Sequence, residues 1–226
     1  MSRIGLLNEK PLHAALKEYY AQPGDQFEVP IDGFVIDIVR EDLLLEIQTA
    51  NFAAIKLKLN KLLRSHHVRL IYPIAQEKWI VKLAAEYENE TTRRKSPKRG
   101  RLEDLFWEMV SFPKLLTHPN FSLEIVLIKE EEIRARDGKR NWRRKGWRIE
   151  ERRLLEVIDR KLFADPADWQ AFTPAPMQSF TTKDLSEALG IGTRLSQRMA
   201  YCLRKSGTSV LIGKRGRANL YRLTDL

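Results

Sequence analysis

Two aliphatic runs joined by a short charged turn constrain the fold of this chain more than any other feature. They lie within residues 31–49, which read IDGFVIDIVREDLLLEIQT. Both runs are mostly aliphatic, as buried β-strands are, and Glu41 and Asp42 fit the two-residue loop of a β-hairpin. The stretch therefore predicts a hairpin with at least one buried face.

Three polar side chains interrupt this hairpin. Counting outward from the turn places Asp37 opposite Glu46, and Gln48 shares the face of Glu46. Two ionised carboxylates that face each other repel, and a bound divalent cation is the simplest way to offset the repulsion. Hard oxygen ligands suit Mg²⁺ or Mn²⁺. The alternative is a structural polar network, with Asp37 paired to Arg40 or Arg69 and Glu46 paired to a lysine.

The elements around the hairpin predict an α/β fold. Proline and apolar spacing predict a first helix, an asparagine and an apolar stripe predict a second, and aliphatic runs predict further strands. The order is helix, three strands, helix, two strands, as in an α/β sandwich. The expected helices span 9–20 and 51–64, and the expected strands outside the hairpin span 27–29, 68–74 and 78–84.

The middle of the chain is less regular. We expect a helix over 102–116, interrupted by Pro113, and a strand over 121–128. The run WRIEERRLLEVI, residues 147–158, fits a strand or a helix equally. Three prolines within 165–176 indicate a linker.

Charge points to a polyanionic partner. The chain has 226 residues, a formal net charge of +10 and a pI of about 9.7, and nucleic acid is the polyanion that such a chain most often meets. Residues 91–101 hold six basic and no acidic residues, and residues 134–153 hold ten basic against three acidic. Trp142 and Trp147 fit base stacking or anchoring of a strand equally well. A protein that is merely basic is the alternative.

Composition also bounds the compartment. No apolar run approaches the roughly 20 residues of a membrane span, so we expect a soluble chain with no membrane partner. The single cysteine, Cys202, excludes an internal disulfide and suits a reducing cytoplasm.

The C-terminal residues 177–226 read as a separate module. A threonine cap and Gly190 bound a helix that ends at Leu189, and a second helix follows from Thr193 to about Lys205. Two strands joined by GKRGRA come next. This order resembles a winged helix-turn-helix, which implies DNA binding, although such modules also dock proteins or form dimers. The residues expected to contact DNA are Arg194, Gln197, Arg198, Tyr201 and Arg204 on the second helix, with Lys214, Arg215 and Arg217 on the wing.

The first 85 residues resemble the PD-(D/E)XK nuclease superfamily, whose fold is restriction-endonuclease-like. Asp37 matches the family's Asp, and Glu46, Ile47 and Gln48 match its Glu-x-Lys with Gln in place of Lys. Glu9, at the start of the first helix, matches the helical Glu. The resemblance implies an α/β/α nuclease core over residues 1–90, with 91–164 as a basic α+β elaboration.

The glutamine departs from the family pattern. Gln48 can hold a water molecule by hydrogen bonds but brings no positive charge. Some members of the superfamily place the lysine on the following helix instead, and Lys56 is the first candidate for that role, with Lys58 second.

Together these features predict a metal-dependent endonuclease that hydrolyses DNA and is targeted by a winged helix. Asp37 and Glu46 would be the metal ligands, with Glu9, Gln48 and Lys56 completing the catalytic set. The alternative is a catalytically inactive DNA-binding regulator or adaptor on the same fold. Cutting both strands ordinarily takes two active sites, so a homodimer is an alternative to a monomer.

Overall fold

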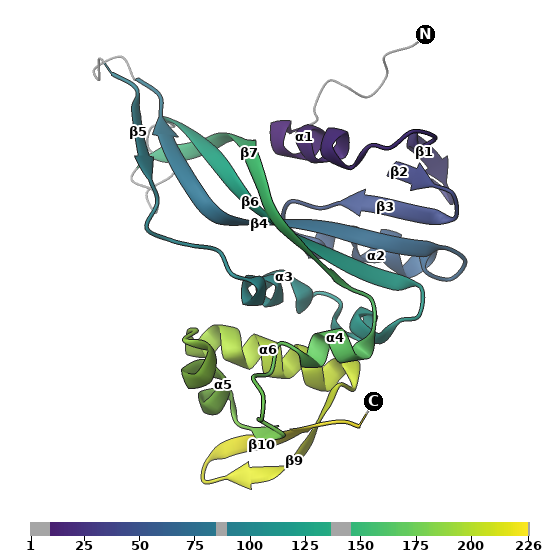
Figure 1. Ribbon diagram of the computed structural model, residues 1–226, viewed down its shortest axis with the longest axis vertical. Helices are drawn as coiled ribbons and strands as arrows, with labels where there is room; N and C mark the ends of the chain where they lie inside the picture. The colour runs from purple at the N-terminus through teal and green to yellow at the C-terminus, as the bar shows by residue number, and fades with distance from the viewer. Residues whose placement is uncertain (1–9, 85–89, 137–145, 226) are drawn as a thin grey trace.

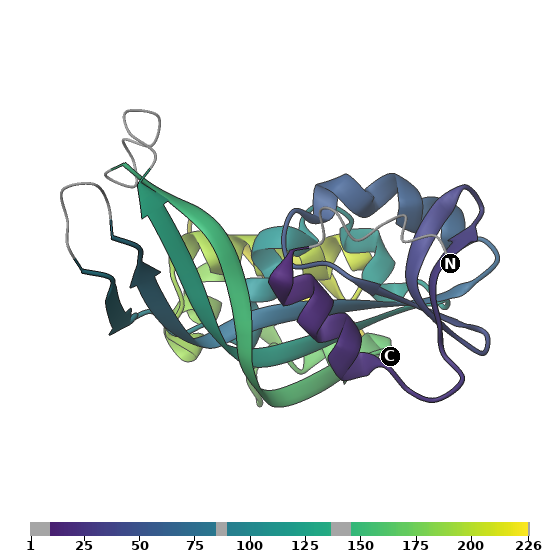
Figure 2. The same cartoon turned by 90° about the horizontal axis from the view of Figure 1, so that it is seen from above.

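The structure is a computed structural model that describes residues 10–84, 90–136 and 146–225, and it is an α/β protein built on one large mixed sheet (Figure 1). The seven-stranded sheet has the order β1-β2-β3-β4-β6-β7, with β5 paired to β4. Helix α1 (Pro11–Tyr20) crosses one face, and helix α2 (Phe52–Leu62) packs on the other (Figure 1, Figure 2). No helix in these described ranges has the length and apolarity needed to cross a bilayer.

The N-terminal part of the sheet is an antiparallel meander of β1 (Gln26–Ile31), β2 (Phe34–Arg40) and β3 (Leu43–Ile47). Arg40 pairs with Leu43 across a two-residue turn, which confirms the predicted hairpin register. Helix α2 then crosses over to β4, which runs parallel to β3. The predicted order of the first 85 residues is confirmed through the second helix and the strand that follows it.

Three long strands form the other part of the sheet. They are β4 (His67–Lys82), β6 (Phe121–Arg136) and β7 (Trp147–Phe163), and the short strand β5 (Thr92–Lys95) lines the edge of β4. β4 and β6 are parallel, whereas β6 and β7 are antiparallel. Their ends extend beyond the helices as an arm (Figure 2).

One prediction for these strands was wrong, and one question that the sequence left open is answered. The two strands expected over 68–74 and 78–84 are one strand, β4, because pairing with β6 continues through an irregularity between Ala75 and Glu77. The ambiguous run 147–158 is a strand, since it pairs along β6. Trp147 is buried, with Lys82 and Arg136 over its ring, so it anchors the strand; Trp142 lies outside the described residues.

The sheet has an apolar core on each face. On one side α1 buries Leu12 and Leu16 against Ile38 and Ile71. On the other side, α2 buries its stripe of Phe52, Leu59 and Leu62 against β4 and β6 in a larger cluster. The two-residue alternation of the strands and the helical spacing on α1 and α2 account for both layers.

The segment between β5 and β6 is more broken than the predicted helix over 102–116. It consists of the 3-10 helix η1 (Leu102–Leu105), the short helix α3 (Phe106–Met109) and the 3-10 helix η2 (Pro113–Thr117). Its buried side chains extend the larger core toward the C-terminal elements.

The segment 165–176, predicted as a linker, is packed. It contains the short helix α4 (Pro166–Gln170), whose Trp169 is 1% exposed and stacks on Phe163 at a centroid distance of 4.9 Å. Phe172 stacks on the same ring. The prolines indicated a break in regular structure, but the aromatic residues between them hold the segment against the sheet layer.

The C-terminal elements are β8 (Ser179–Phe180), α5 (Thr182–Leu189), α6 (Thr193–Ser206), β9 (Ser209–Arg215) and β10 (Ala218–Leu223). Thr181 caps α5, and Gly190 ends it with a φ of 59°, a conformation that glycine adopts without strain. Gly192, rather than Thr193, precedes α6 as its cap. The three strands form a sheet in the order β8-β10-β9, and α6 lies against α3 and η2 (Figure 1).

Candidate active site

The hairpin ladder ends next to the two carboxylates. Ile38 opposite Leu45 is the last pair of the β2–β3 ladder, and Asp37 and Glu46 come directly after it. At this point the carboxylate of Asp37 accepts a hydrogen bond from the backbone N–H of Ile47 at 2.8 Å. The two acidic side chains therefore lie together where β2 and β3 begin to separate, which agrees with the face predicted for them.

Both carboxylates line one open pocket of about 390 Å³. Four elements or their flanks contribute to it: the start of α1, β2, the end of β3 and α2. Its lining includes Lys10, His13, Asp37, Glu46, Gln48, Thr49 and Lys58. The pocket thus combines two acids with basic and amide groups, and it opens to solvent.

Lys58 is the lysine that reaches the pair. Its ammonium group forms an ion pair with Oε1 of Glu46 and donates a hydrogen bond to the carbonyl of Val35 at 2.5 Å. Lys56, the first candidate from the sequence, is exposed and lines a different pocket, so its placement at the site is corrected. The two lysines flank the buried stripe of α2 on opposite sides, and the crossover from β3 to β4 turns the Lys58 side toward the carboxylates.

The environment separates the acidities of the two carboxyl groups. Burial, followed by the charge of Asp37, raises the pKa of Glu46 from its ordinary 4.5 to about 7, although Lys58 opposes the shift. Burial also opposes ionisation of Asp37, but His13, the backbone N–H of Ile47 and the charge of Lys58 together outweigh it, and the pKa of Asp37 lies below the ordinary value. One carboxylate is therefore ionised well below neutrality, and the other titrates near it.

His13 was not predicted as part of the site. Its Nε2 lies 3.2 Å from Oδ2 of Asp37, and it projects from the first turns of α1. Glu9, which the family resemblance placed at the site, lies outside the described residues. A signal was present in the sequence, because in the helix predicted over 9–20 His13 follows Glu9 by four residues and would share its face.

Gln48 lines the pocket, but its amide nitrogen serves the backbone. It donates to the carbonyls of Ala50 and of Asn51, the latter at 3.2 Å. Those hydrogen bonds hold the turn between β3 and α2. Its carbonyl oxygen is the group that Gln48 can offer to a water molecule in the pocket.

The donor set fits a Mg²⁺ ion held mainly by water and substrate. Among the described residues, no group of three or more His, Cys, Asp or Glu side chains is placed to bind a metal. Mg²⁺ does not need such a cage, because it is commonly bound through one or two carboxylates together with substrate phosphates. Asp37 and Glu46 meet this requirement from adjacent strands.

The arginines considered as alternative partners are engaged elsewhere. Arg40 pairs with Asp25 at 2.8 Å, and Arg69 lies 3.7 Å from Glu124. Neither arginine therefore neutralises Asp37 or Glu46. The predicted pairing of Glu46 with a lysine does occur, through Lys58.

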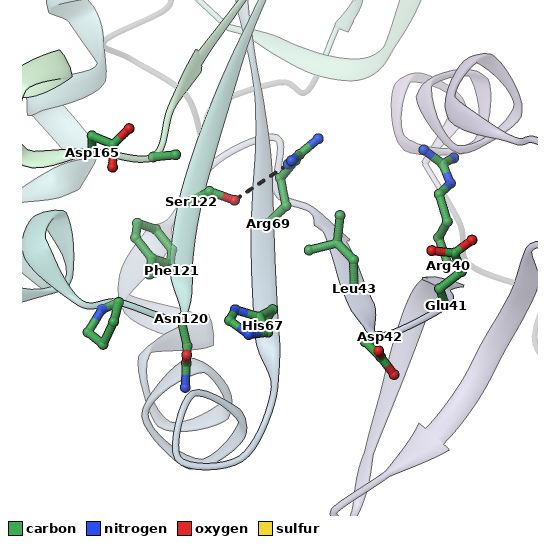
Figure 3. Close-up of a pocket in the computed structure, with 12 residues that line it drawn as sticks. Arg40, Glu41, Asp42, Leu43, His67, Arg69, Asn120, Phe121, Ser122 and Asp165 are labelled. Carbon is green, nitrogen blue, oxygen red and sulfur yellow. Dashed lines mark hydrogen bonds between the residues drawn. The ribbon is translucent and has the colours of Figure 1, made fainter.

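A second open pocket, of about 420 Å³, lies at the turn end of the hairpin (Figure 3). Arg40, Asp42, His67 and Asp165 are among its lining residues, and Arg69 donates to Ser122 at 3.4 Å within it. Neither Asp37 nor Glu46 lines this pocket. Its side chains of mixed charge do not converge as the carboxylates do at the other end of β3.

The residues expected to contact DNA fall into two groups. Arg194, Gln197, Tyr201 and Arg204 on α6 are exposed, as are Lys214 and Arg217 on the β9–β10 hairpin. Arg198 instead donates to the carbonyl of Trp107 at 3.1 Å and lies over its ring at 4.9 Å. Arg215 pairs with Asp184 at 2.9 Å. One side of α6 is therefore attached to α3, whereas Arg194, Gln197, Tyr201 and Arg204 face solvent.

Comparison with known proteins gives two matches. Residues 10–164 match the family described as "Domain of unknown function (DUF8091)". An "Uncharacterized protein" of Treponema pallidum (strain Nichols) is 34% identical over 221 residues, which cover 97% of this chain and 87% of that protein. No solved structure matches.

Proposed function

This chain belongs to the DUF8091 family, and we propose that it is a divalent-metal-dependent endonuclease that hydrolyses phosphodiester bonds in DNA. The observation that carries the proposal is the meeting of Asp37, Glu46 and Lys58 in one open pocket. A helix, a three-stranded meander, a crossover helix and a parallel strand frame that pocket. This element order resembles that of the PD-(D/E)XK nucleases, which supports the proposal that the chain has their restriction-endonuclease-like fold.

Asp37 and Glu46 would hold the ion, for which Mg²⁺ and Mn²⁺ are the candidates. When bound, a divalent cation supplies charge neutralisation at the phosphate and acidifies water for the attack. Asp37 is ready for this role because His13 and the backbone of Ile47 stabilise its ionised form. Glu46 releases its proton near neutral pH, so its contribution grows as pH rises.

Lys58 supplies the positive charge that the family's third motif position lacks here. The carbonyl of Val35 fixes its ammonium group beside Glu46. From this position Lys58 can donate a hydrogen bond to a phosphate oxygen and stabilise the charge that develops during attack. Gln48 orients water with its remaining oxygen, and its hydrogen bonds to the loop limit its movement.

The C-terminal elements would bring the site to DNA. The order α4, β8, α5, α6, β9, β10 resembles that of a winged helix, in which the last helix and the hairpin contact the duplex, and this supports the assignment. The net charge of +10 attracts polyanions such as DNA to the protein. We assign base contacts to the exposed Arg194 and Gln197 near the start of α6.

A plasmid nicking assay tests the catalytic part. Supercoiled DNA is incubated with the full chain and Mg²⁺, and conversion to open-circular and linear forms is followed on gels. We expect activity in the unchanged protein and its loss in Asp37→Asn and in Glu46→Gln. Asp42→Asn, in the exposed hairpin turn, removes a carboxylate of the same kind and should retain activity. Activity that persists without both carboxylates would refute the assignment.

A DNA-binding regulator or adaptor without catalysis is the second candidate. It is favoured by the engagement of Glu46 with Lys58 and by the amide of Gln48, which the loop already uses. Under this alternative the chain binds DNA with a salt-dependent affinity but shows no Mg²⁺-dependent nicking. Sedimentation with and without duplex DNA would tell whether two copies assemble, as cutting of both strands by one complex requires.

A further inference from the structure

A third pocket, of about 330 Å³, lies where the C-terminal elements meet the sheet layer. It opens on the side of α2 that carries Lys56, whereas the candidate active site contacts the side that carries Lys58. Two residues along an α-helix turn through about 200°, so the two pockets use opposite flanks of one helix. Elements distant in the sequence form this pocket: α2, the segment around η2, and α6.

The charge of this pocket has one sign. Lys56 comes from α2, Lys114 from η2 and Lys205 from α6, and none of the described residues that line the pocket is Asp or Glu. None of the three lysines forms an ion pair with another described residue. Three exposed lysines that line one pocket without a carboxylate give it a positive potential, which favours a bound anion.

The other lining groups favour an anion with several oxygen atoms. Tyr201, Asn60 and Ser111 add a phenol, an amide and a hydroxyl, each able to donate a hydrogen bond. Phe112 and Pro113 are among the apolar residues that line the pocket. A phosphate group suits this combination, because its oxygens accept hydrogen bonds from both ammonium and neutral donors.

We propose that this pocket binds one phosphate of the DNA backbone, held jointly by α2, the segment around η2, and α6. The proposal rests on the DNA-binding part of the proposed function and not on cleavage. It gives Tyr201, one of the residues expected to contact DNA, a specific backbone phosphate as its partner. It also gives Lys56 a role that its position outside the active site leaves open.

The salt dependence of duplex binding tests this assignment. The full chain carrying Asp37→Asn is titrated with labelled duplex in EDTA at several salt concentrations, and the affinity is measured by fluorescence anisotropy. Each neutralised phosphate contributes about 0.9 to the slope of log affinity against log salt. Replacing Lys56, Lys114 and Lys205 together by Gln should lower the slope by about 1, because one phosphate site is lost. If the three lysines contacted three separate phosphates, the slope would fall by about 3, and this result would overturn the shared site. An unchanged slope would overturn it as well.

A charge-matched control separates the effect of losing the pocket lysines from the effect of lowering the net charge. Lys17, Lys129 and Lys161 lie on α1, β6 and β7, and their joint replacement by Gln removes the same formal charge. We expect this variant to keep the slope of the parent, and an equal fall in both variants would overturn the proposal. Thermal unfolding of both variants checks that each remains folded.

Two further measurements test which groups and which phosphate occupy the pocket. Tyr201→Phe should weaken duplex binding several-fold without changing the salt slope, because it removes an uncharged hydrogen-bond donor. An unchanged affinity would show that Tyr201 is not part of the site. Titration with 5′-AMP tests a free nucleotide as the source of the phosphate. Lysine-dependent binding of 5′-AMP together with an unchanged DNA slope would overturn the assignment to DNA. A lysine-dependent DNA slope without any nicking would leave this pocket standing and refute only the cleavage.

Discussion

Replacing Glu46 by Gln should make the protein more stable at alkaline pH, although the same change should abolish cleavage. Glu46 is 5% exposed, and burial with the charge of Asp37 raises its pKa to about 7. In the unfolded chain, its pKa returns to about 4.5. Between these values the folded protein holds a proton that the unfolded chain has lost, so stability falls as pH rises through this window.

The magnitude follows from the same two values. A difference between 4.5 and about 7, at 1.36 kcal/mol for each pKa unit, corresponds to about 3 kcal/mol once the carboxylate is fully ionised. Gln has the size of a protonated Glu and no charge. The free energies of unfolding of the two proteins should therefore be similar near pH 4.5, and Glu46→Gln should exceed the unchanged protein by up to about 3 kcal/mol at pH 8 to 9.

Urea denaturation in EDTA, followed by circular dichroism at a series of pH values, measures this difference. Glu41→Gln, in the exposed hairpin turn, is the matched control, and its difference from the unchanged protein should stay small at every pH. A Glu46→Gln protein that is less stable than the parent at pH 8 would refute the reasoning. That result would mean that Lys58 stabilises the ionised carboxylate by more than burial destabilises it.

Four further outcomes are expected. Lys58→Met should lower the nicking rate by about 10²- to 10³-fold, the usual effect of losing one group that stabilises the transition state. Lys56→Met should leave the cleavage rate of the bound complex unchanged in single-turnover assays. Mg²⁺ at about ten times its dissociation constant should stabilise the parent by about 1.4 kcal/mol in thermal or urea unfolding, and Asp37→Asn should lose this effect. Gly100→Ala should destabilise by about 1–3 kcal/mol, because its Cβ would meet Ala75 O at 2.5 Å; a neutral result would refute the close approach of this loop to β4. Trp169→Ala should cost about 3–5 kcal/mol in urea unfolding, and a cost below about 1 kcal/mol would restore the linker interpretation of residues 165–176.

Local patterns predicted much of the fold because the interactions that determine them are local. The Glu41-Asp42 turn and strand alternation predict that Arg40 pairs with Leu43, and this register brings the acids at 37 and 46 together. Thr181 and Gly190 bound α5 through hydrogen bonds and a backbone angle that involve neighbouring residues only. In each case, interactions among a few adjacent side chains and the backbone determine the local structure.

Contacts between distant segments decided the rest. The spacing of α2 leaves Lys56 and Lys58 equivalent on either side of the buried stripe. Only the packing of α2 on the face of the sheet, where it connects β3 to β4, directs Lys58 to Glu46. The burial of Trp169 depends on Phe163 at the end of β7, and the lysine pocket requires α6 to lie beside η2. Periodicity along the chain specifies which residues share a face. Which element covers that face depends on the packing energy between segments that are distant in the sequence.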